Sequence, residues 1–288
     1  MQISDYLTQL QQDKQDLVDN LTEKGITGLT GNETFTELVP EVLNIPSGGA
    51  DEYFTSSISY ISDSEFSWRY TLYKFPAITL NGTSCRYLFY KSPFVKIDVS
   101  KFNTSNVTTF VQMFNDCSKL TEIIGIEDFD LNSLGDGGLS SMFENCSSLT
   151  TLNLNRWKNT QKITSNSRLI FNKCSNLQSL YVNDWDISNS TTFQGWFADC
   201  KKLTNLDLSN WTNTISANHF FMFGGCTSLQ TLDVRNMNFS QSQNYDYMLD
   251  KVPTNCLIIV KNQTEKDWFN TNFSSYINVK TIAEYELN

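Results

Sequence analysis

Apolar residues recur at fixed positions over the second half of the chain. Five cysteines lie 26 to 29 residues apart, and each has a phenylalanine three residues before it and a leucine three residues after it. The five triplets are Phe114, Cys117 and Leu120; Phe143, Cys146 and Leu149; Phe171, Cys174 and Leu177; Phe197, Cys200 and Leu203; Phe223, Cys226 and Leu229. A constant period of about 20–50 residues is typical of a solenoid built from stacked repeats.

Within one repeat the pattern predicts a helix and a strand. Positions −7, −4, −3 and 0 relative to the cysteine are apolar, as in Phe110, Met113, Phe114 and Cys117, which is the spacing of one helix face. Only Ser167 and His219 depart from it, both at position −7. The alternating segments, such as Leu206-Asp207-Leu208, predict short strands. We therefore expect an α/β leucine-rich-repeat solenoid, with one short parallel strand and one short helix per repeat of about 26–29 residues.

The repeats are expected to occupy residues 96–250, between two caps. The predicted strand positions are Ile97/Val99, Ile123, Leu152/Leu154, Leu180/Val182, Leu206/Leu208 and Leu232/Val234. Residues 51–95 are aromatic and irregular, as expected of an N-terminal cap, and Ser92 takes the cysteine position of a degenerate repeat. Residues 251–288 read as strand, helix and strand and form the expected C-terminal cap.

The N-terminal segment 1–45 is expected to be helical and to anchor or oligomerise the protein. Its apolar residues Ile3, Leu7, Leu10, Leu17 and Leu21 follow heptad spacing, with Lys14 in one of the slots. The alternatives are a coiled coil, which would make the protein a homo-oligomer and most plausibly a trimer, and a single amphipathic helix packed on the solenoid. Residues 46–50, which include Pro46 and two glycines, read as a linker.

Composition excludes several classes of partner. The chain carries 21 basic and 31 acidic residues, a net charge of −10, and shows no basic cluster. This balance argues against nucleic acid and anionic membrane surfaces. No signal peptide is apparent at the start, and no run approaches the ~18 apolar residues of a membrane span. We expect no membrane insertion.

Candidate chemistry is sparse. Five of the seven cysteines share one repeat position, so we expect buried thiols rather than disulfides or zinc ligands. The series Asp128, Asp130, Asn132 resembles the start of a calcium loop, but Ser133 replaces the required glycine, which indicates an ordinary loop. His219 is the single histidine and reads as a variant of a repeat position. We expect no enzyme, no cofactor and no metal.

A ligand, if one binds, is expected on the outward face of the strands. Residues between the buried strand positions point outward and stack on their equivalents about 5 Å apart. The candidate face consists of Asp98, Ser100, Asn153, Asn155, Tyr181, Asn183, Asp207, Ser209, Asp233 and Arg235. Such polar side chains suit the sugars of a cell wall, and the neighbours Asp207 and Asp233 suit a cation or an amino group. A merely solvated face is the alternative.

The segments "LTNLDLSNW…MFGGCTSL" and "FNTSNVTTFVQMFNDCSKL" resemble the BspA-like leucine-rich repeats of bacterial and phage surface proteins. The unit at 150–177 departs most from that pattern. The segment "LVDNLTEKGITGLTGNETFTELVPEVLNI" is similar to the leader of tail and other virion proteins of phages that infect Gram-positive bacteria.

The two resemblances together imply a non-enzymatic structural protein on the exterior of a phage particle, made in the host cytoplasm. It would be a tail or baseplate component that contacts other virion proteins through residues 1–45. Its repeats would bind a glycan or protein of the bacterial envelope. A capsid-decorating head fibre and a bacterial surface adhesin are the alternatives.

Overall fold

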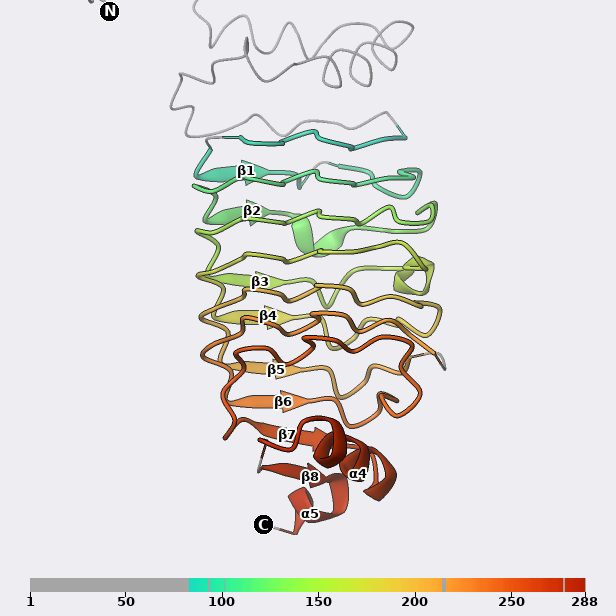
Figure 1. Cartoon of the computed structure of the whole chain (residues 1–288). Helices are drawn as coiled ribbons and strands as arrows, with labels where there is room; N and C mark the ends of the chain where they lie inside the picture. The colour runs from blue at the N-terminus through green and yellow to red at the C-terminus, as the bar shows by residue number, and fades with distance from the viewer. Residues whose placement is uncertain (1–82, 93, 101, 214–215, 277, 288) are drawn as a thin grey trace, which may run out of the picture. The chain divides into compact units, whose positions relative to one another are not determined.

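A computed structural model describes residues 83–287 except 93, 101, 214–215 and 277. These residues form a solenoid in which short parallel strands stack along one side, as predicted (Figure 1). The strands are β1 (Lys96–Asp98), β2 (Glu122–Ile124), β3 (Thr151–Asn153), β4 (Ser179–Tyr181), β5 (Asn205–Asp207), β6 (Thr231–Asp233), β7 (Leu257–Val260) and β8 (Val279–Thr281).

Equivalent residues of successive coils lie beside each other in the sheets. The hydrogen-bonded groups are β1-β2, β3-β4 and β5-β6-β7-β8, and every pair is parallel. The central residues Leu152 and Leu180 are partners, as are Leu206 and Leu232, and all four point into the core. The predicted strand positions are therefore confirmed.

The predicted helix of each repeat is wrong, because two consecutive four-residue turns stand in its place. In one coil the N–H of Met113 donates to the carbonyl of Phe110, and that of Cys117 to Phe114, at 3.0 and 3.1 Å. The third residue of each turn, Gln112 or Asp116, has a φ near +60°, as a type II turn requires. The first and last residues of both turns point inward, so two turns give the same apolar spacing as a helix face.

The paired turns recur in every described coil. The third turn positions with positive φ are Tyr87 and Lys91, Gln112 and Asp116, Ser141 and Asn145, Leu169 and Lys173, Gly195 and Asp199, Phe221 and Gly225, and Tyr247 and Lys251. The first pair falls in residues 85–92, so the degenerate repeat around Ser92 has the same geometry. Alternate N–H groups cross to the next coil, as from Phe110 to Gly138 and from Gln112 to Ser140. Backbone groups are thus satisfied within and between coils.

Aromatic rings stack along the core. Phe114 and Phe143 have centroids 5.5 Å apart, and the same phenylalanine position stacks from Phe89 to Phe223 at 5.4–5.8 Å. A second stack joins Trp157, Trp185 and Trp211, whose indole N–H groups donate to main-chain carbonyls of the preceding coil. One ring per coil at a fixed position therefore holds the coils in register.

The cysteines lie inside this core, as predicted. All seven are buried and none forms a disulfide. The five that share the repeat position each donate a thiol hydrogen bond to the phenylalanine carbonyl of the preceding coil, at 2.8–3.3 Å. They act as small apolar residues with a weak donor.

Among the described residues, helices are few and short. Two 3₁₀ turns come after strands along the chain: η1 (Ile126–Asp128) after β2, and η2 (Thr160–Lys162) after β3. At the C-terminal end β7, α4 (Gln263–Asn272) and β8 give the expected order of strand, helix and strand, and α5 (Ile282–Glu286) follows. Glu265 of α4 is buried and accepts hydrogen bonds from Phe239 N–H and Ser240 N–H at 2.8 and 3.0 Å, which attaches α4 to the preceding coil.

The predicted helical segment 1–45, its heptad residues Ile3, Leu7, Leu10, Leu17 and Leu21, the linker 46–50 and most of the N-terminal segment 51–95 lie outside the described residues. Among the residues that are described, no helix is long and apolar enough to cross a bilayer.

Candidate functional site

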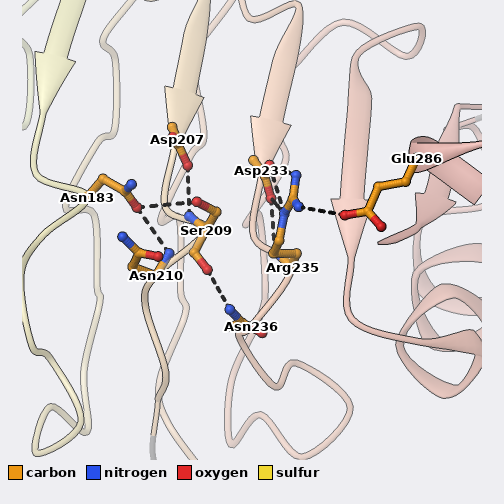
Figure 2. A network of polar contacts seen from close by, with 8 residues as sticks. All are labelled: Asn183, Asp207, Ser209, Asn210, Asp233, Arg235, Asn236 and Glu286. Atoms are coloured by element: carbon orange, nitrogen blue, oxygen red, sulfur yellow. Dashed lines mark hydrogen bonds and ion pairs between the residues drawn. The ribbon is translucent and has the colours of Figure 1, made fainter. Parts of the chain in front are cut away.

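The polar residues predicted to point outward are at least partly exposed beside the strands, except Asp233, which is buried. Figure 2 shows the part of this row from Asn183 to Arg235. Tyr181, Asn153 and Asp207 are exposed at the last residue of β4, β3 and β5, and Tyr181 has 48% of its surface accessible. Asn153 is the register partner of Tyr181, and Asp207 that of Asp233. The structure thus brings the predicted residues together in pairs across neighbouring strands.

Several of these side chains have a structural role that the sequence reading missed. The side-chain oxygen of Asp207 accepts the N–H of Ser209 at 2.9 Å (Figure 2). The same bond, from the last strand residue to the N–H two positions later, links Asp98 to Ser100, Asn153 to Asn155 and Asp233 to Arg235. Asp and Asn favour this local turn. The carboxylate or amide therefore ends the strand as well as facing solvent.

Asparagines connect successive coils just beyond the strands. The Oδ1 of Asn183 accepts the N–H of Asn210 at 3.0 Å and lies 3.5 Å from the Ser209 hydroxyl (Figure 2). The Nδ2 of Asn236 donates to the carbonyl of Ser209 at 2.7 Å. These amides bridge β4 to β5 and β5 to β6 at the strand ends, so Asn183 and Ser209 are largely used within the solenoid.

The like-charge pair Asp207 and Asp233 receives its cation from the chain itself. Arg235 donates to Asp233 through Nε at 3.0 and 3.1 Å and through Nη2 at 2.7 Å (Figure 2). Glu286 of α5 lies 3.5 Å from Nη1, and the ring of Tyr285 lies 5.6 Å from the guanidinium carbon. The hydrogen bonds to Asp233 raise the pKa of Arg235. The positive charge that the sequence suggested an external cation would supply is therefore supplied at Asp233 by Arg235.

After these contacts, the open part of the face lies around β3, β4 and β5. The hydroxyl of Tyr181 and the amide nitrogen of Asn153 make no hydrogen bond to other described residues, while the carboxylate of Asp207 keeps one oxygen free of the Ser209 bond. An exposed tyrosine flanked by amides and carboxylates can stack on one ligand face and accept or donate hydrogen bonds at the rim.

Other residues considered for chemistry are used in the fold. His219 is fully buried between Phe193 and Phe239, and its Nδ1 lies 2.7 Å from the Ser242 hydroxyl. Burial lowers its pKa to about 3. The acidic series is also used, since Asp128 pairs with Arg156 and Asp130 accepts from the backbone of Asn132. These observations agree with the interpretation of both as structural.

The sequence reading missed a cleft of about 650 Å³ between β2 and β3. Lys96, Glu122, Glu127, Asn153 and Arg156 contribute polar groups to it. The only signal was the insertion after Ile123, which lengthens this coil relative to its neighbours.

Two overlapping segments of the chain, residues 78–166 and 137–259, match a protein family described as "Mycoplasma protein of unknown function, DUF285". No curated protein matches this sequence. The matched segments run together from 78 to 259 and cover most of the described coils. The match and the parallel-strand solenoid fit a BspA-like repeat protein. Because the matched residues make up more than half of the chain, the protein belongs to the DUF285 family.

Proposed function

We propose that this protein is a non-enzymatic binding module that recognises a glycan or protein of a bacterial envelope through its strand face. The observation that carries the proposal is the row of exposed polar side chains around Tyr181. Stacked coils repeat this row, at the spacing of a parallel sheet within the pairs β3-β4 and β5-β6, so one scaffold presents several contact points to an extended ligand.

The charge of the whole chain and the core of the described solenoid support a binding role. Buried polar groups are mostly used to connect coils. The side chains that could take part in catalysis, such as His219 and the thiols, are buried and therefore inaccessible to a substrate. The net charge of −10 disfavours anionic polymers and favours neutral or cationic envelope components.

We further propose that the module is part of a phage particle, at the tail or baseplate, with residues 1–45 contacting other virion proteins. This narrower proposal rests on the similarity of the N-terminal segment to virion leaders. Immunogold electron microscopy of particles, with antibodies raised against the full chain, tests it. Labelling at the tail tip supports the proposal, labelling over the capsid favours the head fibre, and unlabelled particles overturn a virion role.

Binding is tested with the full chain, labelled with a fluorophore, on purified walls of Gram-positive cells. Tyr181→Ala should weaken binding by about tenfold, because an exposed aromatic at the centre of an interface contributes strongly. Tyr247→Ala is the matched control, since Tyr247 is 65% exposed in the first turn of its coil rather than on a strand. Equal binding by Tyr181→Ala and the unchanged protein would overturn the strand face as the contact.

A further inference from the structure

The stack of strands is interrupted between β2 and β3. Between β1 and β7 the other coils are 26 or 28 residues long, whereas Glu122 of β2 and Thr151 of β3 are 29 residues apart. No backbone hydrogen bond joins these two strands, although each pairs with its neighbour on the other side. Figure 1 shows a wider step from β2 to β3 than between the strands of any hydrogen-bonded pair.

The insertion after β2 begins with a close contact to the previous coil. Gly125, at φ +81°, packs so closely on Ser100 of the previous coil that a Cβ would lie 2.3 Å from the Ser100 Cα. This contact draws the exit of β2 toward β1. The following η1 turn then places the side chain of Ile126 in the core beside the gap.

Fixed contacts hold the two sides of the gap at both ends. Beyond the strands, the indole N–H of Trp157 donates to the carbonyl of Ile126 at 2.6 Å, and Arg156 pairs with Asp128. Before the strands, the hydroxyl of Ser148 donates to the carbonyl of Ser118 at 2.6 Å. The gap is therefore a built feature of the solenoid, open only in the middle.

The gap is the cleft of about 650 Å³, and this volume lies within the roughly 300–1,000 Å³ of ligand sites. Its floor consists of the buried side chains of Ile123, Ile126 and Leu152. Polar walls rise on both sides, from Glu122 and Glu127 on one and from Thr151 and Asn153 on the other.

The strand edges that border the cleft offer free backbone groups. On the β1 side, the carbonyl of Ile124 accepts a hydrogen bond from the N–H of Val99. On the β4 side, the N–H of Leu154 donates to the carbonyl of Tyr181. Consecutive residues of a strand direct their N–H and C=O groups to opposite sides in the sheet plane. The backbone N–H and C=O groups of Ile123 and Asn153 therefore point into the cleft. An inserted strand would lie about 4.8 Å from each edge and pair with both.

One carboxylate at this site has no partner. Glu127 is half-buried in the cleft wall and makes no hydrogen bond or ion pair with other described residues. The other acidic lining residue, Glu122, is paired with Lys96 at 2.5 Å. A basic ligand side chain would supply the missing charge to Glu127.

We propose that the cleft between β2 and β3 binds an extended peptide that carries a basic side chain. The peptide adds as a strand between the two edges, sets an apolar side chain on the floor and directs its basic group to Glu127. Recognition through an exposed strand edge gives affinity from the backbone and selectivity from alternate side chains. The cleft shares Asn153 with the face around Tyr181 but does not include Tyr181, so Tyr181→Ala and Thr151→Tyr test the two proposals separately.

The test begins with a random library of capped hexapeptides selected on the immobilised full chain, with counter-selection on Thr151→Tyr. Thr151 is exposed at the first residue of β3 and borders the cleft, so a tyrosine there blocks the opening. Thr231→Tyr is the matched control, because Thr231 holds the equivalent position on β6, away from the cleft. Thermal unfolding of both variants verifies that they fold.

The selected peptide is then labelled and titrated by fluorescence anisotropy. Thr151→Tyr and N-methylation of the peptide should each weaken binding by about tenfold, because the tyrosine blocks the opening and N-methylation removes backbone donors that pair with the strand edges. Glu127→Gln should weaken it roughly threefold by removing a partly exposed charge pair, and Thr231→Tyr should leave it unchanged. The proposal is overturned if no peptide prefers the unchanged chain to Thr151→Tyr, if N-methylation has no effect, or if an oligosaccharide array shows sugars competing for the same cleft.

Discussion

The thiol of Cys146 donates a hydrogen bond to the carbonyl oxygen of Phe114 in the preceding coil, with Sγ and O 3.1 Å apart. That carbonyl also accepts the N–H of Cys117 within its own turn, so its second lone pair is used by the next coil. The same arrangement repeats along the array and fills the space beside the phenylalanine stack. The cysteines therefore connect coils without any covalent bond.

The thiols are expected to be unreactive in the folded protein. Burial raises the pKa of Cys85, Cys117, Cys174, Cys226 and Cys256 to about 12, and that of Cys146 and Cys200 is raised as well. Only the thiolate reacts. A disulfide reagent at pH 8 should therefore modify none of the seven cysteines in the native state and all of them in guanidinium chloride. Rapid modification of even one thiol without unfolding would contradict this packing.

The stability of the solenoid should fall between pH 7 and pH 5 because of His219. Its pKa is lowered from 6.5 to about 3 in the folded protein, so the unfolded chain binds a proton more readily. The stabilisation is complete above the unfolded pKa and is lost as pH falls toward 3. The loss at pH 5 should be about 2 kcal/mol. Urea unfolding at the two pH values measures it.

His219→Phe is the control for this pH effect. Phe110 and Phe193 occupy the same repeat position, so a ring of this kind fits the coil. The variant should lose most of the pH dependence above pH 5, where few carboxylates titrate. An unchanged slope in the variant would assign the effect to other groups.

The third turn position should prefer glycine to a β-branched residue. Lys173 has φ +59° and an exposed side chain, so substitutions there report on the backbone alone. Lys173→Gly should be neutral or stabilise by up to about 1 kcal/mol, and Lys173→Val should destabilise by about 1–2 kcal/mol. Chemical denaturation of both variants measures the difference.

Gln178→Val gives the comparison, because Gln178 is also exposed but has no positive φ. It should change stability by less than about 0.5 kcal/mol. If Lys173→Val were equally harmless, the turn geometry assigned to this segment would be wrong.

Removing Arg235 should leave an unpaired carboxylate at the strand face. Asp233 is 9% exposed and accepts three hydrogen bonds from the Arg235 side chain. Arg235→Met should destabilise by about 1–2 kcal/mol, since a largely buried acceptor loses its donor. The double variant with Asp233→Asn should recover part of that loss, and a double-mutant cycle in urea measures the coupling. Additive effects would show that the ion pair contributes nothing.

The sequence predicted the solenoid and its strands correctly because strand residues alternate and repeat at a constant spacing. Leu206 and Leu208 could be placed in the core from this pattern alone, and the structure buries both. The cysteine position was also assigned correctly. These features depend on which side chains are apolar, and the amino-acid sequence alone shows this.

The helix was predicted wrongly because two conformations share one apolar spacing. A helix face and two consecutive four-residue turns both bury positions i, i+3, i+4 and i+7, as Phe110, Met113, Phe114 and Cys117 illustrate. The discriminating signal was the third turn position. Asp116, Asn145, Gly195 and Gly225 occupy it in four of the coils, and Gly, Asn and Asp are the residues that tolerate a positive φ.

The location of the candidate face was predicted from the sequence, but the hydrogen bonds made by its side chains were not. Alternation placed Asp98, Asn153 and Asp207 outward, yet it could not show that each accepts the N–H two residues later. The cleft between β2 and β3 was beyond prediction for a different reason. It depends on the close approach of Gly125 to Ser100, a contact between coils that no local pattern contains.

Because equivalent residues of successive coils stack on each other, the number of coils in such a protein can change in evolution. Leu206 and Leu232 are register partners one repeat apart, and β6 pairs in the same register with β5 and with β7. Deleting or duplicating a whole 26-residue segment would therefore join matching surfaces and shift the far end of the protein by one strand spacing, about 4.8 Å. Loss of a single residue would instead misalign every ring beyond it. The gene can thus vary the reach of this domain in whole steps while its interior stays the same.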